Sequence, residues 1–187
     1  MNFSDTTIFW TNDDSVESLK KLIEVSNRFN WQCIEFFFPV RGAVLLGEMV
    51  HVDYRQQNDG GGIYNLNSVY GKGIVNAYIK AEQQNWAGTV VDQRIMDFLD
   101  EKEIFAEDFF SDYVKRYKVP YKEAVTIDEE EFVFCLVKGK LNEEAFKNYS
   151  NGIKENFAAH GKDVSHPGVK IKLKNTLDYL QSFRESI

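Results

Sequence analysis

Residues 40–81, VRGAVLLGEMVHVDYRQQNDGGGIYNLNSVYGKGIVNAYIKA, decide the fold class of this chain. Residues 40–52 are mostly apolar and rich in β-branched side chains, which favours a β-strand. The polar residues at 54–62 end in three glycines and are typical of a hairpin tip, so residues 63–70 predict the returning strand. After Gly71-Lys72-Gly73 a helix is predicted by apolar side chains along one face: Ile74, Val75, Tyr78, Ile79 and Ala81.

The flanking segments extend this unit in both directions. Residues 3–11 are β-branched and aromatic and predict an opening strand. Asp14 can cap the helix that follows, with Glu17 completing a capping box, and Pro39 ends that helix near residue 36. Residues 89–91 predict a short apolar strand. The resulting order β-α-β-β-α-β predicts an α+β fold, with one mostly antiparallel sheet and both helices on one face, because each helix has one apolar stripe to bury.

The second half of the chain is richer in helix signals. Apolar side chains at helical spacing within residues 95–98 and 105–114 predict two short helices, and residues 132–137 predict a strand. Residues 141–159 and 168–187 predict two longer helices. The only linker candidate, residues 118–128, is poor. We therefore expect a core over residues 1–92 and a helical and strand extension over 93–187, packed on the same domain.

The charge balance excludes several classes of partner. The chain has 22 Lys and Arg against 29 Asp and Glu, a net charge of −7 with an isoelectric point near 5.1. This is the wrong sign for wrapping nucleic acid or coating an anionic membrane. No stretch approaches the roughly 18 apolar residues of a membrane span, and no secretory signal pattern opens the sequence. We expect a cytoplasmic protein with neither nucleic acid nor membrane as a partner.

The cysteines and histidines do not predict a metal cluster. Cys33 and Cys135 both lie in apolar runs, which favours reduced thiols in the core over a disulfide. His51, His160 and His166 are scattered without ligand spacing to either cysteine. A zinc site is therefore not expected.

Four motifs in the first half occur in the order found in one known family. They are FSDT (3–6), PVRGAV (39–44) followed by Gly47, YGKGIVNAY (70–78) and QNWAG (84–88). Together they resemble the catalytic domain of class III nucleotide cyclases, and most of all a divergent bacterial branch. The resemblance covers residues 3–92, about half of the chain, and implies a ferredoxin-like sheet with a helical C-terminal extension.

The resemblance implies a reaction and three residues for it. The family forms a cyclic nucleotide from a nucleoside triphosphate, with two metal ions held by two aspartates, so Mg²⁺ or Mn²⁺ is the cofactor implied if nucleotide binds. Asp5 matches the second of these aspartates. Asn76 falls where the family orients the ribose, and Lys80 where it places a cation, usually arginine, against the phosphate. Spacing of four residues puts Asn76 and Lys80 on one helix face.

Two further positions, Ser68 and Arg41, complete the nucleotide-binding site that the resemblance implies, and one part of it is missing. Ser68 falls where the family reads the base. Arg41 supports its strand electrostatically or caps a surface strand. The strand that carries the family's first metal aspartate and the strand with its base-selecting lysine have no counterpart here. We therefore expect a degenerate, non-catalytic module that binds a nucleoside triphosphate weakly or serves in interaction, and that pairs as a homodimer or with a partner protein. The alternatives are an active cyclase and a pure scaffold.

Overall fold

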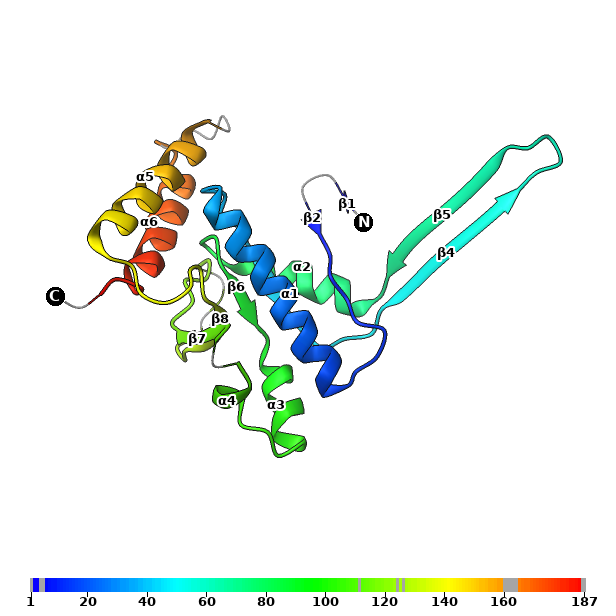
Figure 1. The fold of residues 1–187 in the computed structure, drawn as a ribbon, viewed down its shortest axis with the longest axis horizontal. Helices are drawn as coiled ribbons and strands as arrows, with labels where there is room; N and C mark the ends of the chain where they lie inside the picture. The colour runs from blue at the N-terminus through cyan, green and yellow to red at the C-terminus, as the bar shows by residue number, and fades with distance from the viewer. Residues whose placement is uncertain are drawn as a thin grey trace.

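The computed structural model describes residues 2–3, 6–110, 112–123, 125, 127–159 and 165–185, and it is α+β as predicted (Figure 1). Its helices are α1 (Val16–Glu35), α2 (Lys72–Gln83), α3 (Gln93–Glu101), α4 (Ala106–Phe110), α5 (Glu143–Ala159) and α6 (Pro167–Gln181). Its strands are β1 (Asn2–Phe3), β2 (Thr6–Thr7), β3 (Gly42–Val44), β4 (Val50–Gln57), β5 (Ile63–Tyr70), β6 (Thr89–Val91), β7 (Val114–Tyr117) and β8 (Glu131–Phe134).

The central sheet has the strand order β3-β6-β8-β7 and joins both halves of the sequence. β3 and β6 are parallel, whereas β8 runs antiparallel to β6 and to β7. Neighbouring side chains of β6 and β8 point to opposite faces, so Val90 and Val133 belong to one core cluster and Val91 and Phe132 to another. Both faces of this sheet are therefore covered.

The two clusters show what covers each face. The first packs Val90 and Val133 against Trp86 and against Ile153 of α5 and Tyr179 of α6. The second packs the opposite face against α1, α3 and α4 through side chains including Ile23, Ile95, Leu99 and Phe110. The molecule consists of a sheet between two helical layers, which is a stable way to bury both faces.

The β4–β5 hairpin does not belong to this sheet and corrects the single antiparallel sheet expected for the first half. Among the described residues β4 and β5 pair only with each other, and the hairpin projects from the body of the molecule (Figure 1). The segment 40–52, expected to be one strand, is divided by the linker at 45–49 into β3, inside the sheet, and β4, outside it. Gly47 lies at this division, where a Cβ would be 2.7 Å from Gly73 Cα.

Four further local expectations are corrected. The expected strand over 3–11 is described as the short β1–β2 pair. The cap of α1 is Ser15, whose hydroxyl accepts from the Ser18 N–H, while Asp13 accepts from Ser15. The helix predicted over 105–114 ends early, and Val114 instead begins β7, where it is buried and pairs with Phe134 of β8. The apolar stripe of α2 is also not buried, since Gly73 is the only fully buried residue of that helix.

Candidate functional site

The hairpin has one apolar face that stays open to solvent. Cross-strand partners share a face, so the register that pairs Val50 with Tyr70 and Tyr54 with Leu66 assigns both pairs to the same face. Tyr64 lies on it too, with its ring 6.4 Å from that of Tyr54. The exposed fractions of these side chains range from 40% for Leu66 to 58% for Tyr64. We call this surface the hairpin face.

The opposite side of the same hairpin is mostly polar, although Val69 and Ile63 also lie on it. It carries the pairs Asp53 with Asn67 and Arg55 with Asn65, and His51 hydrogen-bonds Asn67 at 3.0 Å. An apolar face opposite a polar one is the pattern of a strand pair that packs against something on one side. Because the described part of the chain leaves these side chains at least 40% exposed, this pattern marks the hairpin face as an interaction surface.

The first part of α2 adds a second exposed apolar surface next to the hairpin. Val75, Tyr78 and Ile79 lie on one helix face and are 56%, 65% and 46% exposed. We call these three residues the α2 face. Gly71 connects β5 to α2 with φ 145°, and a Cβ there would be 2.5 Å from Glu48 O, so only glycine lets the chain pass this close to the base of β4.

The resemblance assigned Lys80 to a phosphate, but in the described chain its partner is a carboxylate. Lys80 Nζ lies 2.6 Å from Glu131 Oε1, and both side chains are largely buried, at 16% and 14% exposed. Tyr121 donates to the other oxygen of Glu131 at 2.5 Å. Burial, followed by this hydrogen bond, raises the pKa of Tyr121. The ion pair of Lys80 with Glu131 therefore connects α2 to β8.

A second ion pair engages Arg41. Arg41 pairs with Glu82, which also pairs with Lys122 at 3.4 Å. Arg41 Nη1 also donates to the Gln84 carbonyl at 3.5 Å, and burial lowers the pKa of Arg41. Buried Gln84 donates to the Lys80 carbonyl at 3.2 Å. The structure thus brings Arg41 and Lys80 to the C-terminal end of α2, each with a carboxylate partner.

The three remaining predicted site residues are Asn76, Ser68 and Asp5. Asn76 lies one turn before Lys80 on α2 and is half-buried, while Ser68 lies on β5 opposite Val52 and is also half-buried. The structure therefore brings Arg41, Asn76 and Lys80 onto or beside α2 and leaves Ser68 in the hairpin. Asp5, the predicted metal ligand, lies outside the described residues.

The described side chains do not form a binding site for the expected Mg²⁺ or Mn²⁺. In the ranges that the structure describes, no group of three or more His, Cys, Asp or Glu side chains is arranged to hold a metal ion. The carboxylate nearest to Lys80, Glu131, is already occupied by a lysine and a tyrosine.

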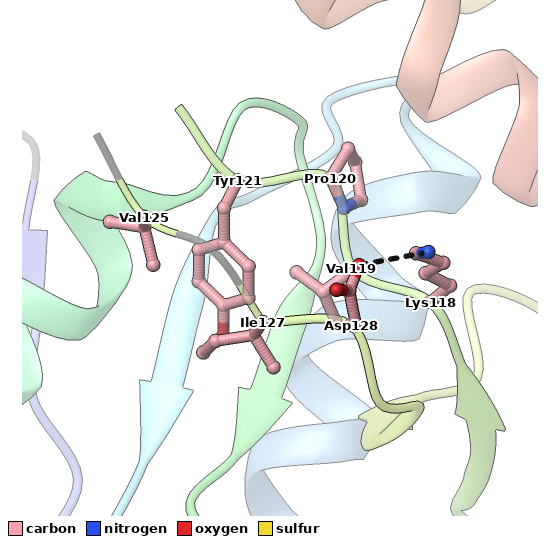
Figure 2. Close-up of a pocket in the computed structure, with 7 residues that line it drawn as sticks. All are labelled: Lys118, Val119, Pro120, Tyr121, Val125, Ile127 and Asp128. Atoms are coloured by element: carbon pink, nitrogen blue, oxygen red, sulfur yellow. Dashed lines mark hydrogen bonds and ion pairs between the residues drawn. The ribbon is translucent and has the colours of Figure 1, made fainter. Parts of the chain in front are cut away.

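A shallow hollow lies beside Tyr121 and has a volume of about 380 Å³ (Figure 2). Val119, Pro120 and Ile127 provide apolar lining, and Lys118 pairs with Asp128 at 3.5 Å. The ion pair is highly exposed on both sides, at 65% and 85%. The hollow contains no charged group that is both buried and unpaired among the described residues, and it adds little to the candidate site.

Comparison with protein-family models, with curated proteins and with solved structures finds no match for this chain. Within the described residues, no helix combines the length and the apolar character needed to cross a membrane. The candidate site therefore depends on the geometry above.

The tyrosines of the hairpin face were not singled out from the sequence. The signal is present, because apolar side chains alternate with polar ones along residues 50–54 and 64–67. The segment 54–62 was interpreted as a hairpin tip, whereas β4 continues to Gln57 and only the residues after it turn. Tyr54 was thereby assigned to a turn instead of to the middle of an amphipathic strand.

Proposed function

We propose that this chain is a non-catalytic module of the nucleotide-cyclase type and that it functions by pairing with a second copy of itself. The observation that carries the proposal is the hairpin face, an apolar surface on a hairpin that joins no other strand among the residues the structure describes. A two-stranded hairpin alone is at best marginally stable in water. A hairpin of eight residues per strand, about 26 Å long, therefore needs a partner surface.

The exposed apolar area of the hairpin face and the α2 face together approaches that of a stable contact. At about 200 Å² per tyrosine, the exposed fractions of Tyr54, Tyr64, Tyr70 and Tyr78 correspond to about 450 Å². The half-exposed aliphatic side chains beside them enlarge the patch toward the roughly 800 Å² per partner of a standard interface. Exposed apolar surfaces of this kind mark interaction sites.

The charge distribution favours a second copy as the partner. With a net charge of −7, two copies repel each other wherever charged surfaces meet. The residues that β4 and β5 place on the hairpin face are uncharged, whereas Asp53 and Arg55 lie on the opposite side. Pairing through the uncharged face buries apolar area without bringing acidic groups together, and a two-fold dimer is the commonest arrangement of identical chains.

Light-scattering mass measured over a range of concentrations tests the pairing. We expect a dimer for the wild type and a monomer for Tyr54→Glu and Tyr78→Glu, because each substitution places a charge in the buried interface. Arg55→Glu is the matched control, since it changes charge on the polar side of the same hairpin and should remain dimeric. A wild-type monomer at millimolar concentration contradicts the proposal.

A second candidate, nucleotide binding, rests on the placement of Asn76 and Lys80. They lie four residues apart on α2, with Arg41 at the end of the same helix. Binding of a triphosphate would have to displace Glu131 from Lys80, so we expect weak binding and no catalysis. Incubation with nucleoside triphosphates and Mn²⁺, followed by chromatography for cyclic nucleotide, shows whether the chain is a non-catalytic module or an active cyclase. Product that disappears in Lys80→Ala would favour the enzyme.

A further inference from the structure

A groove lies between α1 and the start of the C-terminal helices, away from the hairpin face and the α2 face. It has a volume of about 300 Å³. Its floor is apolar, because it is lined by Ile34, Leu136, Val137 and Leu141, all of which are at most 6% exposed. A volume of this size is at the small end of ligand pockets and suits one ring with a short substituent.

Aromatic side chains line two sides of the groove and are held in place. Trp31 donates from Nε1 to the Cys135 carbonyl at 2.9 Å. Tyr149 of α5 donates to Glu35 Oε1 at 2.7 Å. Both rings are half-buried and are fixed by a hydrogen bond at their polar end. They give the groove flat walls that can contact a planar apolar group.

The groove carries an excess of positive charge in an otherwise acidic protein. Arg28 and Lys138 line it and are exposed, and within the described part of the chain neither makes an ion pair. Lys138 Nζ lies 4.6 Å from the centre of the Trp31 ring. Gly139, with φ 68°, turns the chain directly after Lys138. The one carboxylate of the lining, Glu35, already accepts from Tyr149.

We propose that this groove binds a small aromatic carboxylate. The ring would rest on the floor formed by Ile34 and Leu136 and against Trp31, and the carboxylate would face Lys138 and Arg28. The apolar floor contributes binding energy through burial, whereas the two cations select a negative charge at the rim. The site is separate from the proposed pairing surface, so binding does not depend on dimer formation.

Nuclear magnetic resonance of the tryptophan indole N–H groups tests the site with phenylacetate as the probe. The chain has three tryptophans, of which only Trp31 lines the groove, while Trp86 donates to Gln84 and serves as an internal reference. We expect a saturable shift of the Trp31 signal with phenylacetate and at least tenfold weaker binding of phenylacetamide, which has the same shape without the charge. Lys138→Ala should weaken binding of phenylacetate at least fivefold, and Lys170→Ala, an exposed lysine on α6, should leave it unchanged.

Each other outcome overturns the proposal. Equal binding of phenylacetate and phenylacetamide would show apolar adhesion without selection of the carboxylate. Equal shifts of all three tryptophan signals would show unspecific binding. No shift at any concentration up to the solubility of the probe would show that the groove takes no ligand of this class. Unchanged spectra of Lys138→Ala apart from residues near 138 confirm that the variant is folded.

Discussion

Gly152 is a single residue on which the contact between α1 and α5 depends. Phe37 follows α1 with φ 57°, and its ring is so close to α5 that a Cβ on Gly152 would be 2.2 Å from ring carbon Cγ. Helix propensity alone would make alanine about 1 kcal/mol more favourable than glycine inside a helix. Here the clash dominates, because the new Cβ would overlap three carbons of the half-buried Phe37 ring, which would have to move.

We therefore predict that Gly152→Ala lowers the free energy of unfolding by about 1–3 kcal/mol, measured by urea denaturation. Gly168→Ala in α6 is the control. A Cβ there would be 3.4 Å or more from the His166 ring, which is an ordinary contact, so its stability should stay the same or rise. Equal stability of wild type and Gly152→Ala would show that the Phe37 ring does not pack there.

Lys80 and Glu131 form the second residue-scale contact with a measurable consequence. Both are largely buried, and Tyr121 shares the carboxylate. Removing one partner leaves a buried charge with fewer contacts, which typically costs about 1–3 kcal/mol or more. We expect Lys80→Met and Glu131→Gln each to destabilise the fold, and the double variant to lose less than the sum.

A double-mutant cycle with thermal or urea unfolding measures this coupling. Lys118→Met and Asp128→Asn provide the matched control, because their ion pair is 65% and 85% exposed and should show almost no coupling. Additive losses for Lys80 and Glu131 would mean that the pair does not connect α2 to β8, and Lys80 would then be free for a phosphate.

At the scale of elements, the hairpin is the part whose stability should depend on protein concentration. β4 and β5 pair only with each other among the described residues, so their hydrogen bonds have no support from a third strand. We predict that amide exchange in β4 and β5 slows as protein concentration rises, and that Tyr78→Glu abolishes this protection. Exchange in β6 and β8, inside the central sheet, should be the same in both proteins.

Hydrogen exchange followed by mass spectrometry at low and high concentration makes this comparison. Tyr78 lies on α2, outside the hairpin, so a loss of protection in β4 and β5 would be transmitted through pairing and not through a local change. Protection of the hairpin that does not vary with concentration would show that the hairpin is stable within a single chain.

Elements were predictable where periodicity and burial agree, and not where they conflict. The helices α1, α2, α5 and α6 follow from apolar side chains at helical spacing, and each was expected within a few residues. β7 was missed because it has only four residues, VKRY, with charged side chains between apolar ones. Its partner β8 supplies the hydrogen bonds, and that contact is invisible along the sequence.

The candidate site was predictable only in part for the same reason. That Asn76 and Lys80 share a helix face follows from their spacing. That Lys80 meets Glu131 depends on a contact between residues 51 positions apart, which only the fold creates. Likewise, the apolar stripe of α2 is visible in the sequence, but whether it faces the core or the solvent depends on where the hairpin leaves the sheet.

The whole molecule should lose stability at alkaline pH. Burial raises the pKa of the Cys135 thiol to about 11, and burial with the Glu35 hydrogen bond raises the pKa of Tyr149 to about 12. Burial also raises the pKa values of Tyr121 and Tyr179. In the unfolded chain the thiol titrates near 9.0 and the tyrosines near 10.0, so unfolding releases protons above these values.

The sign follows from these raised values. Below about pH 9 the buried thiol and tyrosine hydroxyls are protonated in both the folded and the unfolded chain, so their contribution to stability is complete. Between about pH 9 and 12 the same groups ionise first in the unfolded chain, and the free energy of unfolding therefore falls as pH rises. Burial lowers the pKa of Lys115, which acts in the opposite direction below pH 10.5. Burial also raises the pKa values of Cys33 and Tyr117, so six groups with raised values outweigh this lysine. We predict that the urea midpoint is lower at pH 10.5 than at pH 8, and that the decrease is smaller in Tyr149→Phe. A midpoint that is constant between these pH values, or one that rises, would mean that the buried tyrosines and Cys135 meet solvent in the folded protein.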